Sequence, residues 1–236
     1  MLGTAELLEV WESGLAVDPI RRAVLLHAAA RPATRADDLL DAVVGQRDAD
    51  LFGLRAALFG ASMPVRVACR GCGEELEFEF DATAVSGMAL PAPDPVAVTE
   101  GEWTVVMRMP TSGDLLGAGG AARTLLSSCA LEISRGGRPA TVDDLPAAVA
   151  ASAGQAVAAA DPRADIELDV ACPECGESTG AELDIAGFLW AELDSWARAT
   201  LLDVHLLASS YGWREPDVLA LSPSRRRYYL ELCGHA

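Results

Sequence analysis

The sequence predicts an α+β protein, mostly helical, with a two-hairpin zinc-ribbon-like β element formed by distant segments and flanked by N-terminal and C-terminal helices. Two nearly identical phrases, VACRGCGEE at residues 67–75 and VACPECGE at residues 170–177, each lie between stretches of alternating apolar and polar residues. The flanking regions instead have the three- and four-residue apolar spacing of helices. The chain has 236 residues, of which 51% are hydrophobic and 22% charged, which is typical of a globular protein with a sizeable core.

Residues 1–62 are expected to form an N-terminal helical region. Asp18-Pro19 is typical of an N-cap followed by proline at the first helical position. Thr34, with an acidic residue three positions later, resembles a capping box for a helix that continues through residues 39–44. Another helix is expected around residues 49–59, where a glycine follows and ends it.

Residues 63–82 together with residues 165–186 are expected to form the zinc-ribbon-like element. Alternating patterns within 65–80 predict strands on both sides of the first cysteine pair. The same pattern at 166–170 and 181–185 predicts strands around the second pair.

Residues 83–164 would then be an insertion of a strand and helices between the two hairpins. A connector rich in proline, alanine and glycine is expected at 87–97, followed by a strand at 103–109. A helix is expected over 111–133, capped by its first threonine or serine, and a helix of small residues over 142–160.

Residues 187–236 are expected to form a C-terminal helical region. Apolar residues recur in steps of three and four from Ile185 to Tyr211, which predicts one long helix that breaks at Gly212 or at the residues just after it. Two short helices should follow, one around residues 215–221 and one that begins at Ser222-Pro223.

The four cysteines of the repeated phrases are the candidate metal ligands. A Cys-x-x-Cys-Gly turn between two strands brings two sulfur atoms to one place, and zinc takes four ligands in a tetrahedron. The sequence therefore predicts that two half-sites close on one structural Zn²⁺. Four thiolates leave no coordination position for water, so a catalytic zinc is not expected. The predicted ligands are Cys69, Cys72, Cys172 and Cys175.

Two other interpretations of these cysteines stay open. A redox Cys-x-x-Cys usually opens a helix, whereas a strand is expected after Cys175. Disulfides form in oxidising compartments, but the N-terminus does not resemble a signal peptide, and a cytoplasmic protein is expected. Cys129, within an apolar run, is expected to be a buried packing residue.

Charge and composition argue against several functions. The net charge of −17 disfavours nucleic acid and anionic lipid as partners, and no segment is long and apolar enough to span a membrane. The chain has no lysine and no asparagine, which excludes a P-loop lysine, a Schiff-base lysine and a Cys-His-Asn triad. Its three histidines belong to no catalytic constellation, so the protein is not expected to be an enzyme.

The C-terminal third of the sequence resembles a known family. A long helix ends in His-x-Leu-Ala-x-x-Tyr-Gly-Trp, and a short apolar helix and an arginine run before Tyr-Leu-Glu-Leu follow it. This part resembles the baseplate hub assembly chaperones of T-even-like phages, which also occur in gene clusters for contractile injection systems. The resemblance is good over residues 186–232 and loose over residues 60–235. Its matching positions are His205, Leu207, Ala208, Tyr211, Gly212, Trp213, Val218, Leu219, Leu221, Arg225–Arg227, Tyr229, Leu230, Glu231 and Leu232.

Together with the zinc site predicted from the four cysteines, the resemblance implies a non-enzymatic, zinc-binding assembly factor (chaperone) for the baseplate hub of a phage tail or contractile injection system. The alternative is a structural subunit that is retained in the baseplate. The implied partner is a baseplate hub or spike protein. The sequence leaves open the identity of this partner, the oligomeric state, the stoichiometry and the choice between phage and injection system.

The C-terminal helices are the expected contact surface for that partner. Several apolar residues of the long helix lie off its main stripe, which indicates a second apolar face. Trp213 and Tyr228 are candidate anchors beside this face. Arg225, Arg226 and Arg227 pair internally or contact the partner. The off-stripe residues are Phe188, Trp190, Leu201, Leu202 and Leu206.

Overall fold

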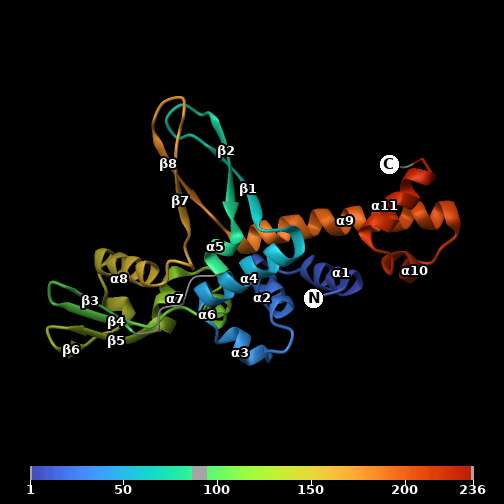
Figure 1. Cartoon of the computed structure of the whole chain (residues 1–236). Helices are drawn as coiled ribbons and strands as arrows, with labels where there is room; N and C mark the ends of the chain where they lie inside the picture. The colour runs from blue at the N-terminus through green and yellow to red at the C-terminus, as the bar shows by residue number, and fades with distance from the viewer. Residues whose placement is uncertain (1, 87–94, 235–236) are drawn as a thin grey trace. The chain divides into compact units, whose positions relative to one another are not determined.

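The computed structural model describes residues 2–86 and 95–234 of the chain (Figure 1). These residues form helices and three small antiparallel sheets, joined by turns and loops, which confirms the predicted α+β class. The chain divides into two compact units, one made of residues 1–25 and 187–236 and the other of residues 26–186. The region boundaries given above remain a prediction. Within the described residues, no helix is both long and apolar enough to cross a membrane.

The first unit is helical. It contains α1 (Thr4–Gly14), the start of α2 (Pro19–Ala30), nearly all of α9 (Ile185–Tyr211), and the short helices α10 (Glu215–Leu219) and α11 (Pro223–Leu232). The bounds of α9 match the predicted long helix, which ends where Gly212 takes a φ of +68°.

Helix α1 packs against α9 within this unit. The indole nitrogen of Trp11 donates a hydrogen bond of 2.8 Å to Asp194. A side chain at Gly14 would overlap the ring of Trp190, so the two helices approach closely at this glycine. The guanidinium of Arg22 lies over the same ring, 4.8 Å from its centre.

The predicted apolar stripe of α9 included Trp196 and Tyr211, and the buried stripe differs from it at these two places. Ala197 is fully buried, whereas the neighbouring Trp196 is only half-buried. Tyr211, expected on the stripe, is 39% exposed. Helices α10 and α11 cover the last turns of α9 with an apolar cluster whose buried members are Val204, Leu207, Val218 and Leu230.

The second unit begins with helices that follow the prediction only in part. The prediction of a helix that continues through residues 39–44 is wrong, because α3 (Ala36–Leu40) stops at Leu40. Its N-cap residue is Arg35, not the predicted Thr34. Val43 instead forms an isolated β-bridge with Thr111. Helix α4 (Val44–Phe59) therefore starts earlier than expected, and it ends at a glycine as predicted.

Helix α4 is tied to the strand that follows it by a buried arginine. Arg55 is 2% exposed and donates hydrogen bonds of 2.6 Å to the carbonyls of Gly60 and Ser62. These carbonyls lie where the chain turns from α4 into β1 (Ser62–Ala68). The charge-assisted bonds fix the start of the first cysteine hairpin on the helix. The hairpin is completed by β2 (Glu75–Asp81), after which α5 (Ala82–Ser86) follows.

A four-stranded antiparallel sheet forms the core of the segment between the hairpins. Its order is β3 (Val96–Glu100), β4 (Trp103–Met107), β5 (Ala130–Arg135) and β6 (Arg138–Pro139). Helix α8 (Ala147–Ala160) packs on β3 and β4 (Figure 1). Buried residues of the sheet and α8 form one apolar cluster that includes Val105, Met107, Ile133, Val149, Ala153 and Val157.

The helix predicted over residues 111–133 is wrong. The structure has two short helices, α6 (Ser112–Ala118) and α7 (Ala122–Cys129), followed by strand β5. Two consecutive glycines with φ of +56° and +86° separate the helices. Ile133 pairs with Val105 in the sheet, where its β-branched side chain packs well.

Two other expectations in this segment need correction. Of the connector expected at 87–97, residues 87–94 lie outside the described residues, and Val96 already belongs to β3. The helix expected over 142–160 is instead a 3-10 turn (Val142–Asp144) followed by α8. Pro146 separates the two because it precedes the first helical residue of α8 as its N-cap.

The N-terminus of α6 is fixed by a capping box with an added ion pair. Asp114 accepts a backbone hydrogen bond of 2.9 Å from Thr111, whose hydroxyl accepts one of 3.2 Å from the N–H of Asp114. Arg108 binds both carboxylate oxygens of Asp114, at 2.6 and 2.7 Å. The Arg108 guanidinium, helped by the Thr111 N–H, holds the pKa of Asp114 well below its usual range.

We expect Asp114→Asn to destabilise the protein by about 1–2 kcal/mol at pH 7, since the variant keeps the shape but loses the charge. Because the folded pKa of Asp114 lies below the unfolded value, its contribution is complete above about pH 5 and is lost as pH falls. Urea unfolding of parent and variant at several pH values measures this difference. A gap between the two that stays constant from pH 7 to pH 3 would contradict it.

Candidate metal centre

The candidate metal centre is built by two separate two-stranded hairpins. The first pairs β1 with β2, and the second pairs β7 (Glu167–Ala171) with β8 (Ser178–Glu182). The exit strand of the second hairpin was expected at residues 181–185, but β8 lies earlier and Ile185 already starts α9. Although a long insertion separates the hairpins in sequence, their turns lie side by side in Figure 1.

The two turns have the same backbone hydrogen bonds because they have the same sequence pattern. The N–H of Cys69 donates to Glu74 at 2.8 Å, and the N–H of Gly73 donates to Cys69 at 2.9 Å. In the second turn the N–H of Cys172 donates to a glutamate carbonyl and that of Gly176 donates to Cys172, both at 2.9 Å. The two glycines have φ of +78° and +75°, a conformation that residues with a side chain rarely adopt.

The structure brings all four predicted ligands together. Their sulfur atoms lie within 4.8 Å of one another. Cys69 lies 3.6 Å from Cys175, and Cys72 lies 3.6 Å from Cys172, sulfur to sulfur, and both of these pairs join the two hairpins. The first cysteine of each turn is buried and the second is exposed.

Contacts besides the cysteines hold the two turns together. The N–H of Arg70 donates a hydrogen bond of 3.2 Å to the hydroxyl of Thr179, which is 1% exposed. A side chain at Gly71 would meet Glu177 at 3.2 Å, so the first turn passes close to the second at this glycine. Leu76 packs in one apolar cluster with the two buried cysteines, one from each turn. The repeated phrase gave no indication of Thr179, because its partner is on the other hairpin.

The electrostatics of the cluster require a cation if all four sulfur atoms ionise. The backbone N–H groups of Cys72 and Gly71 lower the pKa of Cys69 to about 6. The N–H of Glu74 favours the Cys72 thiolate too, but the nearby sulfurs of Cys175 and Cys172 outweigh it and raise the pKa of Cys72 to about 12. Like charges so close oppose each other, and a bound metal ion removes this penalty.

The residues present fit a tetrahedral thiolate-bound metal ion. Two metal–sulfur bonds of ~2.3 Å at the tetrahedral angle separate their sulfur atoms by about 3.8 Å. The 3.6 Å distances between the hairpins are close to this separation. All four sulfurs belong to free cysteines, and each turn leads into a strand, not into a helix. The cluster can therefore bind a metal ion.

The other residues noted in the sequence are not members of this cluster. Cys129 is 2% exposed within the core of the four-stranded sheet, and this burial raises its pKa. Cys233 donates to the carbonyl of Tyr229 at 3.2 Å in α11. In the arginine run Arg226 is buried and its neighbours are exposed, and none of the three forms an ion pair with a described residue.

The fold and this site define a helix-rich α+β protein in which a four-cysteine cluster joins two distant hairpins. The model of the T4 bacteriophage base plate protein family matches residues 37–190, and the chain belongs to this family. Searches of curated proteins and of solved structures give no significant match.

The family match covers a different part of the chain from the best part of the sequence resemblance. It includes both hairpins, all four cysteines and the four-stranded sheet. Residues 186–232, where the resemblance to hub assembly chaperones is good, lie almost wholly outside it. The match therefore supports a baseplate protein that associates with other baseplate proteins.

Proposed function

We propose that the chain is a non-enzymatic, zinc-binding assembly factor for the baseplate hub of a phage tail or contractile injection system. The observation that supports it most is membership of the base plate family over a range that includes the four-cysteine cluster. A family of baseplate proteins suggests a structural or assembly role, not catalysis.

Zinc is the metal proposed for Cys69, Cys72, Cys172 and Cys175. Four cysteine sulfurs from two Cys-x-x-Cys turns are the common ligand set of structural zinc sites. Soft thiolates disfavour magnesium and calcium, which prefer oxygen ligands. In this role the ion joins the two hairpins and leaves no position for substrate.

The choice of an assembly factor over a permanent subunit rests on the C-terminal resemblance and on charge. Residues 186–232 resemble chaperones of hub assembly, and the net charge of −17 suits a soluble helper with a basic partner. A structural subunit that stays in the baseplate is the second candidate, since the family range is equally compatible with it.

Mass spectrometry of purified particles separates these two candidates. An assembly factor is absent from finished particles although its deletion strain makes defective baseplates. A structural subunit is present in them at a fixed stoichiometry. Normal particles from a deletion strain, together with no recovery of any tail component on the purified protein, would contradict both roles.

The C-terminal helices are the proposed contact with a hub or spike protein. Tyr228 and Leu232 lie one helical turn apart on α11 and are 61% and 62% exposed. Trp213, a predicted anchor, is half-buried and stacks on Tyr211 at 4.8 Å between ring centres. Aromatic residues supported in this way are favoured at the centres of protein interfaces.

We expect the double variant Tyr228→Ala, Leu232→Ala to recover at least tenfold less hub or spike protein in co-purification from the native gene cluster, since loss of an interface hot spot costs about 2 kcal/mol or more. The variant should remain folded because both side chains are exposed. Leu131→Ala is the matched control, since this leucine is 56% exposed on β5. Equal recovery of the hub or spike protein with the parent and both variants would contradict a contact through the C-terminal helices.

A further inference from the structure

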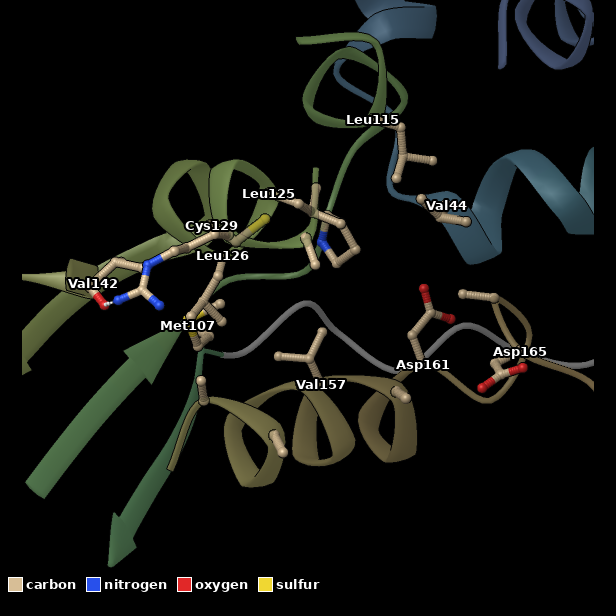
Figure 2. A pocket seen from close by; sticks show the side chains of 18 of the residues that line it. Val44, Met107, Leu115, Leu125, Leu126, Cys129, Val142, Val157, Asp161 and Asp165 are labelled. Carbon is tan, nitrogen blue, oxygen red and sulfur yellow. Dashed lines mark hydrogen bonds between the residues drawn. The ribbon is translucent and has the colours of Figure 1, made fainter. Parts of the chain in front are cut away.

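A second surface, remote in sequence from the C-terminal helices, is a groove of about 800 Å³ in the second unit. Its walls come from α7 and α8, with contributions from α4, α6 and β4 (Figure 2). The volume is in the range of ligand-binding pockets. Apolar side chains dominate the walls, among them Val44, Leu115, Leu125, Leu126 and Val157. All residues that line the groove lie within the range matched by the family.

The face that α8 presents to this groove consists of small residues. Ala147, Ala151, Gly154 and Ala158 line it and recur in steps of four, three and four, which places them on one side of the helix. The first three are exposed and the last is half-buried. A face without bulky side chains lets a second helix approach the α8 backbone closely.

Gly154 has no role in the internal packing of the described residues. A glycine inside a helix costs about 1 kcal/mol relative to alanine. Its φ is not positive, and a Cβ added to it would have no described atom within 4 Å. The space beside this glycine therefore belongs to the groove.

One end of the groove is acidic and contains a buried carboxylate with a free oxygen. Asp161 is 5% exposed; its Oδ2 accepts a hydrogen bond of 3.0 Å from Gly45, while its Oδ1 has no hydrogen-bond partner. Figure 2 shows this carboxylate between α8 and Val44. Asp165 and Glu182 line the same groove and are exposed.

The charges around the groove favour a cation at this end. None of its three carboxylates forms an ion pair with a described residue, whereas the two arginines in the walls are each paired, Arg47 with Asp48 at 2.7 Å and Arg123 with Asp143 at 3.1 Å. The C-terminal carbonyls of α8 add partial negative charge at the same end.

We propose that this groove binds an amphipathic helix of another baseplate protein, with a lysine or arginine beside Asp161, Asp165 and Glu182. Laying the apolar face of a helix into a groove between helices is a common mode of peptide recognition. The inference rests on the proposed function only in that the partner is a baseplate protein. It adds a second contact and states the chemistry of the segment that occupies it.

Photo-cross-linking in the native gene cluster tests the occupant. A photoreactive phenylalanine analogue at Ala151 faces the groove, and the same analogue at Gln155 is the control, because Gln155 is exposed on α8 but does not line the groove. The expected product at Ala151 joins the chain to an apolar helical segment of a baseplate protein with a basic residue within two turns. A product within the chain itself, with a second copy, or with an acidic segment would overturn the proposal.

Filling the groove provides the second test. Gly154→Leu should lower recovery of the cross-linked partner at least tenfold, while Gln155→Leu should change it less than twofold. Thermal unfolding should show Gly154→Leu to be as stable as the parent, because the added side chain meets no described atom at its Cβ. Asp165→Asn with Glu182→Gln should weaken recovery several-fold at low salt and less at high salt.

These results separate the groove from the proposed function. If a baseplate protein co-purifies equally with the parent and with Gly154→Leu, the groove proposal is wrong and the proposed function still stands. Failure of the parent to recover any baseplate protein contradicts both. Loss of binding in Gly154→Leu but not in the Tyr228, Leu232 variant assigns the contact to the groove alone.

Discussion

Replacing Cys172 with serine is expected to remove the metal and to separate the two hairpins. Each hairpin is an isolated two-stranded sheet, which is marginally stable by itself in water. Binding of structural zinc to small domains contributes about 10–16 kcal/mol at pH 7, so most of the order in this region would depend on the ion. Elemental analysis should give close to one zinc per chain for the parent and almost none for the variant.

A chelator should reproduce the effect of Cys172→Ser on the parent protein, and thermal unfolding should show the loss in both cases. Cys233→Ser is the matched control, because this cysteine lies in α11 and its hydrogen bond to Tyr229 can be made by a hydroxyl. If Cys172→Ser melts like the parent, the structural-zinc proposal is wrong.

Replacing Gly45 with alanine is expected to destabilise the second unit by about 3 kcal/mol, from overpacking and a lost buried hydrogen bond. Gly45 lies in the first turn of α4, where backbone N–H groups have no partner inside the helix. The carboxylate of Asp161, at the end of α8, accepts this N–H from 116 residues away in sequence. A Cβ at Gly45 would overlap that carboxylate.

The matched control is Gly53→Ala in the same helix. No described atom lies within 4 Å of a Cβ at this position, so alanine should stabilise the helix by up to about 1 kcal/mol. In urea unfolding, the free energy of unfolding should therefore be lower than that of the parent for Gly45→Ala and higher for Gly53→Ala. Equal stability of Gly45→Ala and Gly53→Ala would show that Asp161 does not hold the start of α4.

Local patterns were sufficient for the elements in which one period dominates the sequence. The helix from Ile185 to Tyr211 was predicted, although Ile185 was also assigned to the strand before it, because apolar residues recur every three or four positions along its whole length and a glycine follows it. The strands around both cysteine pairs were also found, since alternation and a Cys-x-x-Cys-Gly turn occur together. The prediction of one helix over 111–133 was wrong, because a short run of apolar residues fits a helix and a strand equally well.

The sequence by itself determined the four candidate ligands, since the repeated phrase requires the same turn twice and its glycines allow the positive φ of each turn. Only the tertiary structure decided that these turns meet, through sulfur pairs at 3.6 Å and the bond from Arg70 to Thr179. It also decided that Asp161 caps α4 and that α7 and α8 enclose a groove. The physical reason is range in the sequence. Turn and helix preferences act over a few residues, whereas these contacts join residues about a hundred positions apart. Only the packing of the folded chain decides which of these distant residues come into contact.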